Sequence, residues 1–284
     1  MTDLAMSRQV YADEIDALCK LQTRALVDAL ATVPRERFLP PGPWFVRGER
    51  DFGGPRQTTD ADPRHVYQNH SIAIDPVRQL FNGAPGFLLS MIDALAIAPG
   101  SRVLHLGVGT GYYTALMAHV GGGRGRVVAI EVDAGLAQQA TDNLAAMPWV
   151  EVRHGDGTAA LDEPFDAILI NAGVTHPQDT WLDALSANGR LILPLTATMP
   201  QLGPLGKGFM TIVTKAADGS LAARPLSIVM IYSAIGLRDE TINAQIGQAF
   251  MRSPIPTFTR LRRDRHDAGS GCWLHAETFC LATD

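Results

Sequence analysis

Strand-like and helix-like segments alternate through the middle of the chain, and this alternation limits the fold more than any other feature of the sequence. The strand-like runs are 102–106, 126–130, 150–153, 165–170 and 190–193. The helix-like segments are 112–120, 134–147 and 180–185. Such alternation is typical of βαβ units with right-handed crossovers and a parallel sheet. The sequence therefore predicts an α/β fold.

Both ends of the chain depart from this alternation. After Pro194, two strand-like runs at 209–214 and 226–232 flank an Asp218-Gly219 turn, so we expect the end of the sheet to be antiparallel. Before the alternating region, residues 8–31 place apolar side chains at three- and four-residue spacings and predict one amphipathic helix. Residues 40–64 are rich in Pro, Gly, Asp and Arg, which indicates an extended arm or loop.

A glycine-rich loop follows the strand-like run 102–106. Gly107, Gly109 and Gly111 stand between a strand and a helix, where glycine permits a tight turn and a close approach of the backbone to a ligand. Their Gly-x-Gly-x-Gly spacing differs from the Gly-x-Gly-x-x-Gly spacing of dinucleotide-binding loops. The loop therefore favours a ligand other than NAD.

Carboxylates follow the next two strand-like runs. Glu131 ends one run, and Asp156 lies between two glycines after the other. A carboxylate at the first position can accept hydrogen bonds from both hydroxyls of an adenosine ribose, and one at the second can accept from an adenine amino group. Because the carboxyl ends of parallel strands form one ligand crevice, we expect both to bind the same ligand. The alternatives are an exposed strand-end charge for Glu131 and a helix N-cap for Asp156.

These residues resemble the S-adenosylmethionine-dependent methyltransferases of the Rossmann-like class, and the chain is similar in particular to the protein-L-isoaspartate O-methyltransferase family. The similarity runs from about residue 20 to residue 237, and its motifs occur in the family's order at residues 31–40, 99–104, 155–157, 164–173 and 188–194. The resemblance implies a mostly parallel Rossmann-like sheet with an antiparallel C-terminal end. It also implies S-adenosyl-L-methionine as the cofactor.

The resemblance also suggests a division of the chain by role. We expect residues 1–85 to form an N-terminal helix and arm that cap the active site, and residues 86–237 to bind the cofactor. Residues 238–284 extend past what the family requires and have no predicted role. The implied cofactor-binding residues are His105, Gly107, Gly109, Gly111, Glu131, Asp156 and Gly157, and the implied catalytic residues are Asn82, Gly83 and Asn171. A turn is the alternative interpretation of Asn171.

Two positions depart from the family's pattern. The family carries Thr-Ile-Ser-Gln-Pro where this chain has the segment 81–85, so Gly83 stands at the position of the hydroxyl. The family also carries an acidic residue where this chain has His105, whose alternative interpretation is a packed strand histidine. The first departure predicts poor methylation of isoaspartyl peptides.

The predicted activity is O-methylation of a carboxylate in a protein or peptide, with L-isoaspartate as one candidate. A carboxylate with a pKa near 4 is ionised at neutral pH, so the reaction needs no general base. The alternatives are a methyltransferase for another peptide or small-molecule acceptor and a cofactor-binding module without catalysis.

Composition excludes several other classes of protein. A net charge of −5 argues against nucleic-acid binding driven by charge, and the apolar stretch 225–237 is shorter than the roughly 20 residues of a membrane span. Three cysteines without a Cys-x-x-Cys motif, and an N-terminus without a signal-like segment, predict a cytoplasmic protein. We therefore expect neither nucleic acid nor membrane as a partner.

Two clusters near the C-terminus could each have a chemical role, one as a metal site and one as a basic binding patch. Cys272, His275, Cys280 and His266 are residue types that bind zinc, but they lack the paired spacing of zinc knuckles, so the sequence predicts no metal. Four arginines between residues 260 and 265 are interrupted by an aspartate and predict a solvated strand face.

Overall fold

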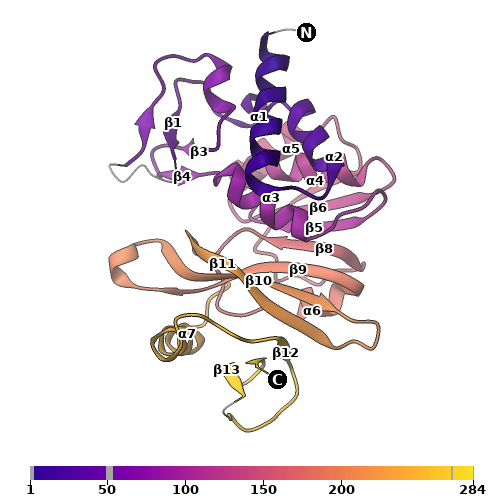
Figure 1. The fold of residues 1–284 in the computed structure, drawn as a ribbon, viewed down its shortest axis with the longest axis vertical. Helices are drawn as coiled ribbons and strands as arrows, with labels where there is room; N and C mark the ends of the chain where they lie inside the picture. The colour runs from indigo at the N-terminus through magenta and orange to yellow at the C-terminus, as the bar shows by residue number, and fades with distance from the viewer. Residues whose placement is uncertain (1–2, 49–53, 270, 284) are drawn as a thin grey trace. The chain divides into compact units, whose positions relative to one another are not determined.

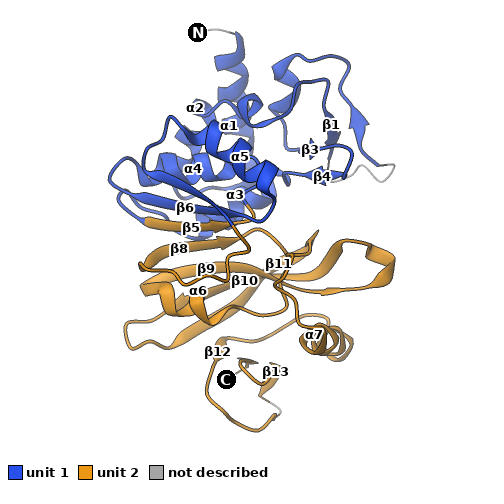
Figure 2. Cartoon of the chain, turned by 180° about the vertical axis from the view of Figure 1, so that it is seen from behind, with its two compact units in different colours: residues 1–101, 108–154 blue, residues 102–107, 155–284 orange. Residues whose placement is uncertain are grey.

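The computed structural model describes residues 3–48, 54–269 and 271–283 (Figure 1). The chain forms two compact units, and both contain segments that are separate in the sequence. The first unit comprises residues 1–101 and 108–154, and the second comprises residues 102–107 and 155–284 (Figure 2). The division by role at residues 85 and 237 concerns function and stays a prediction.

The first unit combines an N-terminal helical region with a small antiparallel sheet. Its first half contains α1 (Asp3–Cys19), α2 (Arg24–Thr32), η1 (Arg35–Phe38), β1 (Phe45–Arg47), β2 (Arg56–Gln57), η2 (Pro63–Val66), β3 (Ser71–Asp75), β4 (Leu80–Phe81) and α3 (Pro85–Ala94). The small sheet has the order β2-β1-β3-β4. Its second half contains α4 (Tyr112–Gly121), β6 (Arg126–Glu131), α5 (Ala134–Leu144) and β7 (Val150–His154), with β6 and β7 parallel.

The single helix predicted over residues 8–31 is wrong, because the structure has two helices there. Lys20 adopts a left-handed conformation with φ 53°, which ends α1. The carboxylate of Asp93 then accepts hydrogen bonds from the backbone N–H groups of Gln22 and Thr23 at 3.0 and 2.9 Å, just before α2 begins. The apolar spacing continues across this break and conceals it in the sequence.

The predicted arm at residues 40–64 contains two short strands, and a buried arginine binds the segment that follows it. Residues 49–53 of this prediction lie outside the described residues. Arg35 has no exposed surface, and its guanidinium donates to the carbonyls of Val66, Gln68 and His70 at 2.7–3.0 Å. These bonds satisfy carbonyls that no regular secondary structure pairs, so Arg35 fixes the chain just before β3.

The second unit is a sheet with a parallel and an antiparallel part. It contains β5 (Arg102–Leu106), β8 (Phe165–Ile170), α6 (Asp179–Ala184), β9 (Leu185–Thr198), η3 (Pro200–Leu202), β10 (Leu205–Lys215), β11 (Leu221–Tyr232), α7 (Glu240–Arg252), β12 (Arg260–Arg262), β13 (Cys272–His275) and β14 (Cys280–Ala282). Strands β5, β8 and β9 are parallel, and β9 to β13 continue antiparallel in the order β9-β10-β11-β12-β14-β13. Strand β8 and residues 189–197 of β9 are almost continuously buried, as expected for strands covered on both faces.

The α/β class and the antiparallel C-terminal end of the sheet are confirmed. The antiparallel part is longer than the sequence predicted, because residues 238–284 add three strands to it. Arg238 connects this extension to the sheet by donating to the carbonyls of Gly173 and Thr196 at 3.0 and 2.7 Å. In the described part of the chain, no helix combines the length and the apolar character needed to cross a bilayer.

Candidate functional site

The glycine loop has a backbone conformation that favours glycine. Gly107, Gly109 and Gly111 have φ values of 75°, 56° and 95°, a region that other residues rarely adopt. Space is also limited, because a Cβ atom at Gly109 would lie 3.1 Å from Ile74 Cδ1 and one at Gly111 would lie 3.0 Å from Leu144 Cδ1. Gly111 is also the N-cap of α4, so the loop leads directly into a helix N-terminus.

Glu131 is bonded to this glycine loop. It ends β6 with only 6% of its surface exposed. One carboxylate oxygen accepts from the Gly109 N–H at 2.8 Å, and the other accepts from the Asp133 N–H at 3.1 Å. Burial raises the pKa of Glu131, and these backbone hydrogen bonds oppose the rise. An ionised carboxylate offers about four acceptor positions, so Glu131 retains acceptor capacity for a ligand. The alternative of an exposed strand-end charge is wrong.

The segment at residues 81–85 contains a polar atom without a partner. The side-chain oxygen of Asn82 accepts from the Ile72 N–H at 2.9 Å. Its amide nitrogen Nδ2 is buried and has no hydrogen-bond partner among the described residues. A buried donor without a partner is costly in a folded protein. Asn82 Nδ2 is therefore a buried donor that no described acceptor satisfies.

Gly83, next to Asn82, also has a conformation that favours glycine. Its φ is 79°, and a Cβ atom there would lie 2.8 Å from Leu88 Cδ1. Its carbonyl accepts from the Tyr113 hydroxyl at 3.0 Å. The sequence analysis did not identify Tyr113. Its place in the first turn of the helix after the glycine loop is a signal that could have suggested it.

Asp156 in the second unit is exposed. A single carboxylate oxygen, Oδ1, accepts from the Thr158 N–H at 3.0 Å and from the Thr158 hydroxyl at 2.7 Å. These two bonds lower the pKa of Asp156, so the group is ionised at neutral pH. No helix follows at 158–161, and the N-cap alternative is therefore wrong. The following residue, Gly157, has φ 79°, and a Cβ atom there would lie 2.1 Å from Leu106 Cδ2.

Asn171 and His105 also belong to the second unit. The backbone N–H of Asn171 donates to the Leu106 carbonyl at 2.8 Å, and its side-chain nitrogen lies 3.4 Å from the Gly107 carbonyl. Asn171 thus supports the first glycine of the loop. His105 has no exposed surface, and burial lowers its pKa to about 3, so it is neutral. This burial argues against direct contact between its imidazole and a cofactor.

The structure thus joins two pairs of predicted residues, Gly109 with Glu131 in the first unit and Asn171 with Gly107 in the second. Gly83 is bonded instead to Tyr113 at the start of α4. These contacts show which side chains shape the backbone of the loop and which retain free polar atoms.

Comparison with known proteins gives the same family from sequence and the same fold from structure. The model of the family described as protein-L-isoaspartate(D-aspartate) O-methyltransferase (PCMT) matches residues 56–235. A protein-L-isoaspartate O-methyltransferase of Methylorubrum populi is 31% identical over 242 residues, which cover 83% of this chain and 99% of the relative. A protein-L-isoaspartate O-methyltransferase of Methylorubrum extorquens is 33% identical over 225 residues, which cover 77% of this chain and 85% of the relative.

Two solved structures share the fold. One is a putative protein-L-isoaspartate O-methyltransferase from Plasmodium falciparum in complex with S-adenosyl-L-homocysteine, with a TM-score of 0.60, 16% identity, and coverage of 80% of this chain and 97% of that chain. Another protein-L-isoaspartate O-methyltransferase has a TM-score of 0.60 and 20% identity, and covers 89% of this chain and 72% of that chain. By its sequence match over more than half of its length, the chain belongs to the protein-L-isoaspartate(D-aspartate) O-methyltransferase family.

Proposed function

We propose that this protein is an S-adenosylmethionine-dependent O-methyltransferase that esterifies a carboxylate of a peptide or protein. The observation that supports this most strongly is the hydrogen bond from Gly109 to the buried carboxylate of Glu131, in a chain of this family. A buried carboxylate that retains acceptor capacity beside a glycine loop suits a ligand with neighbouring hydroxyl groups. The relative from Plasmodium falciparum with S-adenosyl-L-homocysteine supports the same cofactor class.

The residues present fit this cofactor. We propose that Glu131 accepts from the ribose hydroxyls and that Asp156 accepts from the adenine amino group. The second oxygen of Asp156 is free for this role, because both bonds from Thr158 go to its Oδ1. The loop glycines contribute backbone rather than side chains, since a Cβ atom at Gly109 or Gly111 would already touch a neighbour. His105 contributes by packing.

The chain has little chemistry to perform beyond positioning. S-adenosylmethionine, when bound, supplies a methyl group activated by its positive sulfur. An acceptor carboxylate is ionised at neutral pH without a base, so the protein must hold it in place and exclude water. We propose that Asn82 donates its unpartnered Nδ2 hydrogen to the acceptor carboxylate. We propose that Asn171 and Gly83 act as positioning residues through the Gly107 and Tyr113 contacts.

The glycine at residue 83 favours a second candidate for the methyl acceptor, which is a carboxylate other than that of L-isoaspartate. No side chain at residue 83 can supply the hydroxyl of the family's motif. The backbone around Gly83 is also adapted to glycine, as its φ of 79° and its distance to Leu88 show. We therefore propose that isoaspartyl peptides are poor substrates compared with another carboxylate of a peptide or protein.

Transfer of a labelled methyl group tests both proposals. The wild-type protein is incubated with methyl-labelled cofactor, an isoaspartyl peptide and the matching aspartyl peptide, and the product is treated with base. We expect base-labile label, as for a methyl ester, with lower turnover of the isoaspartyl peptide than a serine-bearing relative shows. Cofactor binding without label in any peptide or protein acceptor would instead favour a non-catalytic module. Equal isoaspartyl turnover in both proteins would contradict the role assigned to Gly83.

Other properties of the chain agree with a protein that acts on peptides in a reducing compartment, which we propose to be the cytoplasm. In the described part of the chain, none of the three cysteines forms a disulfide, as expected where disulfides are rare. In the basic cluster, Arg262 pairs with Asp264, and Arg263 pairs with Asp179 and Asp183. These ion pairs reduce the positive charge available to nucleic acid.

A further inference from the structure

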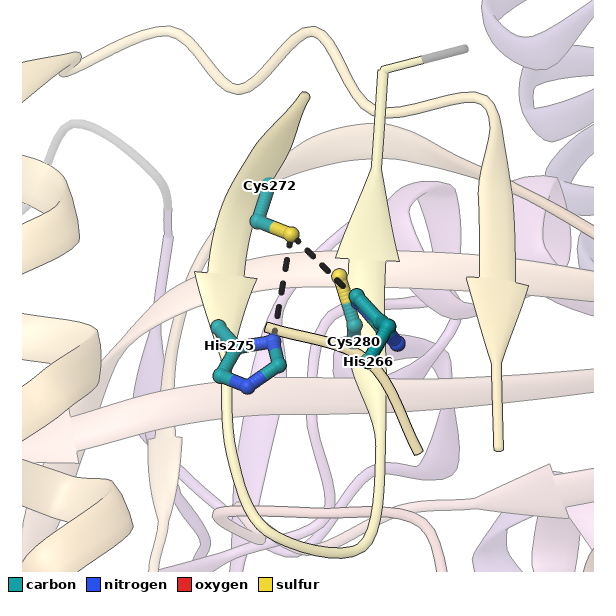
Figure 3. A group of neighbouring side chains, drawn as sticks. All are labelled: His266, Cys272, His275 and Cys280. Atoms are coloured by element: carbon teal, nitrogen blue, oxygen red, sulfur yellow. Dashed lines mark hydrogen bonds between the residues drawn. The ribbon is translucent and has the colours of Figure 1, made fainter. Parts of the chain in front are cut away.

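Four side chains of metal-binding type meet in the C-terminal extension (Figure 3). Cys272 and His275 lie on β13, Cys280 lies on β14, and His266 lies in the segment between β12 and β13. One ligand atom from each residue lies within 4.8 Å of the others. We propose that this cluster binds one zinc ion as a structural site with two cysteine and two histidine ligands.

The distances in the cluster match a tetrahedral zinc site. With Zn–S near 2.3 Å and Zn–N near 2.0–2.1 Å, the edge between a sulfur and a nitrogen ligand is about 3.6 Å. Cys272 Sγ lies 3.6 Å from His266 Nε2 and 3.8 Å from His275 Nδ1. These two sulfur–nitrogen distances therefore need to change little for the ligands to coordinate one zinc ion.

A backbone carbonyl orients His266 for metal binding. His266 Nδ1 lies 2.9 Å from the Asp264 carbonyl oxygen. Because a carbonyl oxygen can only accept, Nδ1 must carry the hydrogen in this contact. In the neutral ring, Nε2 then has a free lone pair, and Nε2 is the atom that faces Cys272. Metal-binding histidines commonly donate their other ring N–H to a carbonyl in this way.

The charge and softness of the ligands select the kind of metal. Two thiolates and two neutral imidazoles balance the charge of a divalent ion, and sulfur ligands favour zinc over magnesium or calcium. Both cysteines are free thiols, so no disulfide occupies the sulfurs. Cys280 is buried, and the other three residues are partly buried, which limits access of water to the proposed ion.

Strand pairing explains how the residues meet without a regular spacing in the sequence. In the hairpin, His275 pairs directly with Cys280, and Cys272 pairs with Ala282. The strands are only three or four residues long, and strands so short are weakly stable alone. A zinc ion would cross-link both strands of the hairpin and the preceding segment. The sequence prediction of no metal did not take this pairing into account.

Metal analysis of the full chain provides the first test. The protein is purified without a histidine tag or chelator, dialysed and analysed by mass spectrometry for metals. We expect about one zinc ion per chain in the wild type and less than about a tenth of that in Cys272→Ser and His275→Gln. Cys19→Ser and His65→Gln are the matched controls, because both residues lie outside the cluster, and they should retain the metal.

Cobalt titration gives a test that does not depend on whether the variants fold. Metal-free wild type is prepared with a chelator and titrated with Co²⁺ while absorption is recorded. We expect thiolate-to-cobalt charge transfer and the visible bands of tetrahedral coordination, which zinc then displaces. Absence of zinc from the purified wild type together with absence of these bands would overturn the proposal, as would a Cys272–Cys280 disulfide in the native protein. Cofactor affinity is measured in parallel, so failure of this proposal and failure of the proposed function are separate results.

Discussion

Glu131 and Asp156 are both carboxylates that follow a strand, but their surroundings differ. Glu131 is buried and bonded to the backbone of the glycine loop, and burial raises its pKa. Asp156 is exposed, and its side-chain bonds among the described residues go to the nearby Thr158 and lower its pKa. The same functional group is therefore part of the loop's structure at Glu131, whereas at Asp156 it stays exposed, where we propose that it serves only the ligand. This difference predicts distinct effects of mutation at the two positions.

The largest expected effect is that of Glu131→Ala. It removes a proposed ribose contact and the acceptor of the Gly109 N–H, so both cofactor affinity and folding should suffer. Affinity for S-adenosylhomocysteine in calorimetry should fall by about 1 to 3 kcal/mol, the range for hydrogen bonds to a charged group. Denaturant unfolding should show a loss of similar size. Glu151→Ala, which removes a partly exposed glutamate of β7 that is paired with Arg126 and Arg153, is the control and should leave cofactor affinity unchanged. Unchanged affinity in Glu131→Ala would remove the basis for the proposed ribose contact.

Asp156→Ala should separate binding from stability. The side chain is exposed and has only local bonds, so unfolding should be nearly unchanged. Cofactor affinity should fall by about 3- to 10-fold, as expected for one solvent-exposed hydrogen bond. Calorimetry and denaturant unfolding on the same preparation measure both. A loss of stability equal to that of Glu131→Ala would erase the proposed difference between the two carboxylates.

Gly83→Ser tests the role of a residue that is separate from the two carboxylates, in the segment proposed to position the acceptor. Its φ of 79° and the nearby Leu88 should make serine costly, by roughly 1 kcal/mol or more of stability. Cofactor affinity should stay the same, and isoaspartyl turnover should rise if the hydroxyl orients the acceptor. Adding Ala84→Gln rebuilds more of the family's segment.

The control for this substitution is Gly100→Ser. Gly100 has φ 90° but no neighbour within 4 Å of an added Cβ atom. It should show the backbone cost without the contact to Leu88 and without any change in turnover. A weaker cofactor affinity in Gly83→Ser than in Gly100→Ser would place residue 83 in cofactor binding instead.

The smallest effect is a difference in pH dependence. Because burial raises the pKa of Glu131 above its ordinary 4.5, the folded state holds this proton more tightly than the unfolded state. The stabilisation linked to this proton is therefore fully present below pH 4.5 and is lost as pH rises through the folded pKa, whereas the bond to the Gly109 N–H does not depend on it. For Asp156 the sign is opposite: its contribution is present above its ordinary 3.8 and is lost as pH falls through the lowered folded pKa.

Unfolding of the wild type, Glu131→Gln and Asp156→Asn between about pH 3 and pH 7 measures these two contributions. The stability difference between wild type and variant should change in opposite directions for the two substitutions. Parallel curves for both variants would show that the two carboxylates have equivalent surroundings.

Features that depend on local sequence could be predicted. The glycine loop and Glu131 follow from residues next to one another or one strand apart, and most of the alternating elements lie close to their predicted ranges. The break between α1 and α2 was missed because Asp93, about seventy residues later, supplies the acceptor. The four residues of the C-terminal cluster were named from the sequence, but no metal was predicted there, because strand pairing rather than spacing brings His275 and Cys280 together.

Burial could not be predicted either, and it changes the interpretation of two site residues. For His105, the sequence left a cofactor contact and a packed strand histidine as alternatives, and only the structure shows that its side chain has no exposed surface. Asn82 was expected in the site from the family's segment. Its unpartnered Nδ2 became visible only with the contacts to Ile72.

A crystal structure of the full chain with S-adenosylhomocysteine tests the central claim most directly. We expect both ribose hydroxyls within hydrogen-bond distance of the Glu131 carboxylate, at about 2.5–2.7 Å as for hydroxyl donors to a charged oxygen. We also expect the Gly109 N–H to Glu131 bond to be retained and the adenine amino group to donate to Asp156. A ligand whose ribose lies away from Glu131, with that carboxylate bonded only to the backbone as in the present structure, would contradict it.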